Sequence, residues 1–367
     1  MARLHWNLRQ LSSIVLFLLM ATAFTEKECG RLDPFHRSGA RVPFPLIYIA
    51  FCIMLMTAVW LFGAPTFSVL VLLAATLVAV LGVPHGGLDH WTGRRLLASH
   101  FRERWWLMFF PGYLAVGLAV AAAWLAFPVL TVLGFFFLSA WHFGREDQHR
   151  TASIQEDRRS SAFVEHVSAI ALGGLVIWIP AITRPLEMEG LLRMIVPSND
   201  SQDAAQIVRW THWGAMVLCP MAILFSVRQL LSDRADRTGS KGNNGAIDWS
   251  VWVPLATAGI AAFTPILVSF TAYFCFWHSM LGLSRLQSQE GLTRPQFMMA
   301  VLPLSALAVG GVAALGFLVR FADGRPAIPA SLQTLFIGLS AIAVPHLLLH
   351  EWFDLAQRKH PMAELMS

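Results

Sequence analysis

The sequence predicts an all-α protein that crosses the membrane many times, as a polytopic bundle of about eight to ten transmembrane helices. Of its 367 residues 56% are hydrophobic and 13% are charged, whereas a soluble domain carries about 25% charged residues. The mean hydropathy is +0.57, and long apolar runs recur between residues 45 and 350. The net charge of +5 comes almost wholly from arginine. No basic cluster is interleaved with aromatic residues, so nucleic acid is not an expected partner.

A short apolar run at residues 11–24 follows Arg3 and Arg9 near the start of the sequence. The run is too short for a comfortable span, and its charged start and Ala21-Thr22-Ala23 ending are typical of a signal peptide or a signal anchor. Polar residues follow it. We therefore expect an N-terminal segment at 1–44, a transmembrane helical domain at 45–350 and a C-terminal tail at 351–367.

The apolar runs that follow each have the length of one membrane-crossing helix, since about 20 residues span the ~30 Å hydrocarbon core. The first six are expected at residues 45–64, 67–84, 105–126, 127–143, 163–183 and 208–228. A polar loop at residues 229–248, the best linker in the chain, separates them from the remaining runs.

The apolar stretch at residues 250–283 contains Pro254 and Pro265 and is too long for one straight span. Because proline removes a backbone donor and breaks helices, we expect a helix broken near Pro265 or two short helices. The last two spans are expected at residues 297–319 and 330–350.

The arginines predict the orientation of the bundle, because short cytoplasmic loops are enriched in basic residues. Three loops that fall on one side carry Arg94, Arg95, Arg102 and Arg104, then Arg145, Arg150, Arg158 and Arg159, then Arg228, Arg234, Arg237 and Lys241. The loop at 184–206 on the other side carries Arg184 and Arg193 but also Glu187, Glu189, Asp200 and Asp203. The arginine-rich side is predicted to be cytoplasmic, in a multi-pass protein of the cell (inner) membrane.

The thirteen histidines are numerous for a membrane chain, and several stand at the ends of apolar runs. If residues 250–283 cross twice, or enter and return, these ends lie on the arginine-rich side and converge at similar depth. A polar side chain inside the bilayer needs a partner, and neutral imidazole is the commonest ligand of borderline first-row metals. The predicted metal ligands are His85, His142, His278, His346 and His350.

A metal-bound imidazole needs an acceptor for its other ring nitrogen. The carboxylates closest in sequence to the predicted ligands are Asp89, Glu146, Asp147, Glu351 and Asp354. His346 and His350 are four residues apart and share one helix face, so either one, or both, could be a ligand. His166 and His212 are expected to be interfacial residues or caps instead.

Four short motifs resemble those of the Brp/Blh family of membrane β-carotene 15,15′-dioxygenases, in the same order and with similar spacing along residues 80–350. They are Pro84-His85-Gly86-Gly87-Leu88-Asp89, Trp141-His142-Phe143-Gly144 with Asp147, Trp277-His278-Ser279, and Pro345-His346. The resemblance implies central cleavage of β-carotene by O₂ into two retinals, with Fe(2+) held by histidines. It also implies a lipid bilayer as the setting, and an opsin could receive the retinal.

By position, His85, His142 and His278 match the iron histidines of that family, and Asp89 and Asp147 are expected to orient histidines from behind. One departure matters: the family pattern runs His-Ser-x-x-His at the third motif, and Gly282 stands where the second histidine is expected. His350, one turn after His346, or His90 could fill the gap. Otherwise the site has three histidines, or the substrate or the activity has changed.

Two alternatives come from other classes of protein. A membrane di-iron desaturase or hydroxylase needs several His-x-x-x-His boxes, and here only His346 and His350 fit one. A non-enzymatic carotenoid-binding or transport protein is the second alternative. A retinal Schiff-base protein is disfavoured, because Lys27, Lys241 and Lys359 all lie outside the apolar runs.

Overall fold

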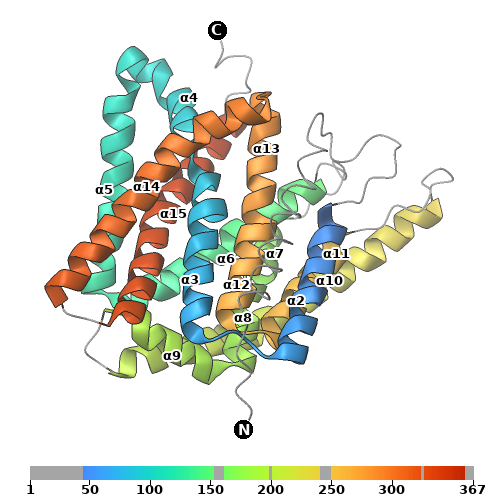
Figure 1. Cartoon of the computed structure of the whole chain (residues 1–367). Coiled ribbons are helices and arrows are strands. Elements are labelled where there is room, and N and C mark those ends of the chain that lie inside the picture. The colour runs from blue at the N-terminus through green and yellow to red at the C-terminus, as the bar shows by residue number, and fades with distance from the viewer. Residues whose placement is uncertain (1–43, 153–160, 198–200, 240–248, 324–325, 360–367) are drawn as a thin grey trace.

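The computed structural model describes residues 44–152, 161–197, 201–239, 249–323 and 326–359, and every element in these ranges is helical (Figure 1). This confirms the predicted all-α class. The expected N-terminal segment at 1–44 lies outside the described residues except for Phe44. The last helix continues to Lys359, past residue 350, where the C-terminal tail was expected to begin.

The first half of the chain contains α2 (Phe44–Phe62), α3 (Phe67–Leu77), η1 (Val78–Gly82), η2 (Val83–Gly86), α4 (Asp89–Phe101), η3 (Arg102–Arg104), α5 (Trp105–Ala126), α6 (Pro128–Ala152), α7 (Ala162–Gly173) and α8 (Leu175–Thr183). The second half contains α9 (Pro185–Ile195), α10 (Ser201–Gly239), α11 (Trp249–Phe263), α12 (Ile266–Thr271), η4 (Ala272–Ser279), α13 (Met280–Glu290), α14 (Arg294–Asp323) and α15 (Ala327–Lys359).

Within the described residues, six helical stretches are long and apolar enough to cross a membrane, or seven if the bent pair α7–α8 forms one span. The protein is therefore a multi-pass membrane protein. The number is smaller than the eight to ten spans expected, although the stretch at 67–126 contains both α3 and α5. Part of the difference arises at α11, which has only 15 residues, and at the 55° bend between α7 and α8.

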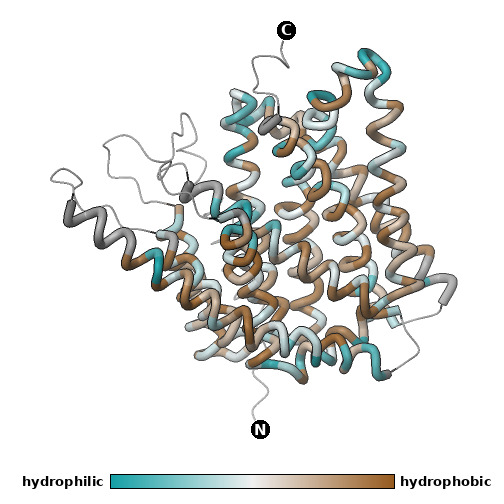
Figure 2. The backbone as a smooth tube through the Cα atoms, turned by 180° about the vertical axis from the view of Figure 1, so that it is seen from behind, coloured by the Kyte–Doolittle hydropathy of each residue, from teal (hydrophilic) through white to brown (hydrophobic). Residues whose placement is uncertain are grey.

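Both ends of the bundle are hydrophilic and its middle is hydrophobic, as expected of helices that cross a membrane. Hydrophilic residues gather at the upper and lower ends, and hydrophobic residues predominate between them (Figure 2). The arginine-bearing helix α4 lies at the upper end in Figure 1, whereas α9, in the loop with the acidic residues, lies across the lower end.

The break expected at Pro265 is confirmed, since α11 ends at Phe263 and Pro265 caps α12. The first turn of a helix has backbone N–H groups without intrahelical partners. Glu187 of α9 satisfies one of them, because its Oε1 accepts a hydrogen bond from the backbone N–H of Ile266 at 2.8 Å. The lower end of the broken span is thus anchored to the helix that crosses beneath it.

Two segments leave the α-helical pattern directly before predicted ligands. η1 and η4 are π-helical, and η1 leads into the 3₁₀ turn η2 that carries His85, while η4 carries His278. π-helical turns are rare in proteins, and those that occur often lie at functional sites. Their wider turns change which side chains face the interior, so these irregularities help to determine where the two imidazoles point.

The helix that carries His142 packs very closely against α7. A Cβ added to Gly144 would collide with the backbone of Ala169, and one added to Gly173 would collide with the backbone of α6. The glycine of the Trp141-His142-Phe143-Gly144 motif therefore has a packing reason. It lets α6 and α7 approach closely enough to fix the position of His142.

Candidate metal centre

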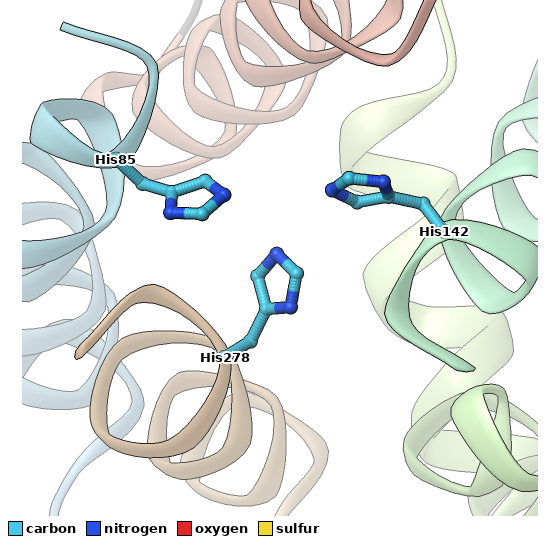
Figure 3. Close-up of side chains that lie close together, drawn as sticks. All are labelled: His85, His142 and His278. Carbon is cyan, nitrogen blue, oxygen red and sulfur yellow. The ribbon is translucent and has the colours of Figure 1, made fainter. Parts of the chain in front are cut away.

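Three predicted ligands come from three separate elements and meet in the interior. His85 on η2, His142 on α6 and His278 on η4 point toward a common centre (Figure 3). One ligand nitrogen from each lies within 4.8 Å of the others. His278 is almost fully buried, with 1% of its surface exposed. The convergence expected from the helix ends is therefore present.

His346 of α15 completes a ring of four imidazoles. Ring centroids are 5.0 Å apart for His85 and His278, 5.1 Å for His278 and His142, 5.6 Å for His142 and His346, and 5.1 Å for His346 and His85. Each of the four thus has two neighbours within this set, and the ring closes. We call these four residues the histidine ring.

Asp89 determines which nitrogen of His346 is available. The Asp89 carboxylate accepts a hydrogen bond from Nδ1 of His346, with N···O distances of 2.8 and 2.9 Å. The Tyr113 hydroxyl on α5 lies 2.8 Å from Oδ2 of Asp89 and 3.2 Å from the carbonyl oxygen of Ile342. Because Nδ1 carries the donated proton, Nε2 of His346 keeps its lone pair. This contact agrees with the expectation that Asp89 orients a histidine, and Tyr113 is a partner that sequence analysis missed.

His350 lies behind this pair rather than in the histidine ring. Its Nε2 is 3.5 Å from Oδ1 of Asp89, its side chain is 34% exposed, and its ring centroid is 4.4 Å from that of His346. Asp89, His346 and His350 form a second group whose ligand atoms lie within 4.8 Å of one another. Of the two residues that could complete the site, His346 is the one that reaches the other three histidines.

Buried ring nitrogens support a ligand at the centre. Nδ1 of His85, Nε2 of His142 and Nε2 of His346 are buried and have no hydrogen-bond partner within the described residues. Buried polar atoms without partners are costly and rare. A set of neutral nitrogen donors suits a first-row transition metal. The residues present therefore fit a metal ion.

Asp147 contacts the helix that carries His278. Its carboxylate accepts hydrogen bonds from Nε1 of Trp277 at 2.9 Å and from the hydroxyl of Tyr273 at 3.1 Å. Both donors belong to η4, and Trp277 directly precedes His278. Asp147 thus fastens the π-helical segment to α6.

Two further carboxylates near the site form ion pairs with arginine. Glu146 lies 3.2 Å from Arg285, and Glu351 lies 3.9 Å from Arg145.

Gly282 stands directly beside the histidine ring. A Cβ added at this position would collide with Cε1 and Nδ1 of His85. The imidazole of His85 therefore occupies the space that any side chain at position 282 would need. The absent family histidine leaves no gap at its own position, because the ring of His85 fills it.

Histidines outside the ring have other surroundings. Nδ1 of His166 accepts a hydrogen bond from Nε1 of Trp141 at 3.0 Å, and Nδ1 of His212 donates to the carbonyl oxygen of Ala181 at 3.0 Å. His90, which was considered as a substitute ligand, belongs to neither of the two groups that could hold a metal.

The histidine ring borders a cavity of about 60 Å³. Apart from the four imidazoles its walls are mainly apolar, with aromatic rings from three elements. These aromatic rings belong to Phe135, Phe143, Phe270 and Phe274. Sequence analysis did not single out these aromatics, although Phe270 and Phe274 precede His278 at intervals of four residues.

Known proteins resemble most of this chain. The profile of the β-carotene 15,15′-dioxygenase family matches residues 76–354, which include all four members of the histidine ring. A β-carotene 15,15′-dioxygenase of the uncultured marine bacterium 66A03 is 26% identical over 282 residues, 75% of this chain and 91% of that protein. The probable β-carotene 15,15′-dioxygenase Blh of Halobacterium salinarum is 24% identical over 345 residues, 88% of this chain and 95% of that protein.

No solved structure matches this chain. The family match nevertheless covers most of the sequence and all the residues that meet at the centre, and it confirms the resemblance seen in the motifs. The chain belongs to the β-carotene 15,15′-dioxygenase family.

Proposed function

We propose that this protein is a non-haem iron oxygenase that cleaves β-carotene, or a related carotenoid, at the central 15,15′ double bond to give retinal. In this reaction the carbon–carbon double bond breaks, and each of its two carbons takes one oxygen atom from O₂. The observation that carries the proposal is the closed ring of four imidazoles at the edge of an apolar cavity.

The protein's own groups have limited roles, since the cofactor carries the difficult chemistry. His85, His142, His278 and His346 hold the ion. Asp89, supported by Tyr113, keeps His346 in the tautomer with a free Nε2. Asp147 positions His278 through Trp277. Bound ferrous iron supplies the activation of O₂, and no protein acid or nucleophile is required.

The membrane setting suits this substrate. A carotenoid is a long polyene that dissolves in the bilayer, so an enzyme whose apolar cavity lies within a membrane bundle can receive it directly from lipid. We propose the cell (inner) membrane as the location, with the arginine-rich loops in the cytoplasm. An opsin is a candidate recipient of the product.

A second candidate is a di-iron desaturase or hydroxylase. It is favoured by one observation, the second group of Asp89, His346 and His350. However, the hydrogen bond from His346 to Asp89 already pairs two of its three members. Iron analysis of the purified protein separates the candidates, because one ion per chain supports the oxygenase and two ions support the di-iron class.

The test of function is expression in a β-carotene-producing host that makes no retinal. With iron supplied, we expect the orange colour to fade and retinal to accumulate, and a His142→Ala variant to leave the cells orange. Persistent colour and no retinal in cells that contain the membrane-inserted protein would count against the proposal. Bound carotenoid without oxygen consumption would favour a binding or transport protein instead.

A further inference from the structure

Three rings of the broken span form a stack that ends at the histidine ring. The rings of Phe270 and Phe274 are nearly parallel, with centroids 5.5 Å apart and an interplanar angle of 8°. Phe274 and His278 continue the stack at 6.0 Å and 19°. We call Phe270, Phe274 and His278 the aromatic ladder. A fourth ring, Phe336 of α15, lies 5.9 Å from Phe270 at its far end.

The helical geometry suits rings that are spaced four residues apart. Four residues make more than one turn of an α-helix but less than one turn of a π-helix, whose hydrogen bonds join residues five apart. The interval from Phe270 to Phe274 begins in α12, and the interval from Phe274 to His278 lies in η4. In either geometry a four-residue interval is close to one turn, so the three rings lie on one side of the helix.

The ladder lines the cavity and becomes more exposed away from the histidine ring. Phe270, Phe274 and His278 all border the cavity. His278 is 1% exposed and Phe274 is 9% exposed, whereas Phe270 and Phe336 are partly exposed. A long chain that reaches the histidine ring through this cavity therefore passes along the ladder.

We infer that Phe270 and Phe274 are the stacking surface for one arm of the substrate's conjugated chain and thereby determine which double bond lies at the histidine ring. This inference deepens the proposed function and rests on it. A flat, extended π-system matches parallel aromatic rings in shape and electronic character. The ladder runs for eight residues, roughly 12 Å of helix, so it guides a long polyene and gives a short alkene little to bind.

A neighbouring glycine supports a specific position for Phe274. A Cβ added to Gly82 of η1 would lie 2.5 Å from Cε1 of Phe274. Gly82 therefore gives the Phe274 ring room to lie in the stack. Substitution of Gly82 by alanine offers a way to disturb the ladder without changing any aromatic residue.

The experiment measures binding of β-carotene to the full-length, iron-loaded protein in nanodiscs without oxygen. The readout is the induced circular dichroism of the bound polyene. The variants are Phe270→Leu and Phe274→Leu. Phe276→Leu is the matched control, because Phe276 is also partly exposed on η4 but packs against Phe51 of α2, at 4.6 Å between centroids. It does not line the cavity.

We expect Phe270→Leu and Phe274→Leu to weaken binding about two- to tenfold, the loss typical of one aromatic stacking partner. Phe276→Leu is expected to bind as the unsubstituted protein does, and iron content is expected to stay the same in Phe270→Leu and Phe276→Leu. After oxygen is admitted, Phe270→Leu is expected to give apocarotenoids of unequal length beside retinal.

Unchanged binding and unchanged products in Phe270→Leu would overturn the inference, as would an equal loss in Phe276→Leu. If Phe274→Leu is not recovered in the membrane, Gly82→Ala replaces it and is expected to weaken binding in the same way. The two proposals fail separately. A protein that binds polyene through the ladder without cleaving it refutes only the proposed reaction, and a cleaving enzyme indifferent to the ladder refutes only this inference.

Discussion

Replacement of Gly282 by histidine introduces the residue that the family pattern has four positions after His278. We expect this substitution to damage the metal centre rather than to complete it. A Cβ at position 282 overlaps the imidazole of His85 in the present structure. That ring cannot retreat freely, since the rings of His278 and His346 lie 5.0 and 5.1 Å from it, centroid to centroid.

The magnitude follows from the cost of overpacking, which is about 1–3 kcal/mol for extra atoms forced into a packed interior. If His85 relieves the overlap by leaving the histidine ring, this cost falls on metal binding. At about 1.4 kcal/mol per factor of ten, iron affinity then decreases roughly five- to 150-fold.

The assay is iron content by mass spectrometry after dialysis against graded concentrations of a chelator. Gly282→Ala isolates the steric effect, because it adds the Cβ without a new ligand, and it is expected to lose iron as well. Gly310→Ala is the control, since a Cβ at Gly310 meets nothing within 4 Å. If Gly282→His holds iron more tightly than the unsubstituted protein, His85 yields its place to the new imidazole, and the steric reasoning is wrong.

Three further predictions concern the ligands and the packing. His346→Ala is expected to lose most of its iron, whereas His350→Ala retains it; equal losses by metal analysis would place both residues at the ion. Asp89→Asn is expected to lower iron affinity about 10- to 100-fold, as measured by chelator competition, and Tyr113→Phe to lower it less. Gly144→Ala is expected to lower the midpoint of thermal unfolding, because its Cβ meets backbone; a midpoint equal to that of Gly134→Ala, which meets nothing, would contradict this.

The outline of the site could be predicted because burial restricts histidine strongly. An imidazole in an apolar run needs a partner, and the ends of successive spans lie close together. His85, His142 and His278 therefore stood out in the sequence, and the structure brings them together. The break at Pro265 was equally predictable, since proline interrupts helical hydrogen bonding.

Finer features depend on contacts between distant residues. His346 and His350 share a helix face, and the sequence offers no way to choose between them. The choice depends on Asp89, which lies 257 residues before His346 and holds it in the ring. The aromatic ladder depends on a π-helical turn that propensity does not reveal, and the role of Gly282 depends on the position of His85.

The π-helical segment η4 also constrains how this region can vary in length. Each residue of a helix adds a fixed rotation, about 100° in an α-helix and less in a π-helix, so loss of one residue from η4 would rotate α13 relative to α12. Gly282 would swing away from His85, and another side chain would meet the imidazole in its place. A point substitution in η4 tests a single contact. A one-residue deletion is expected to keep α12 and α13 from making their present contacts at the same time.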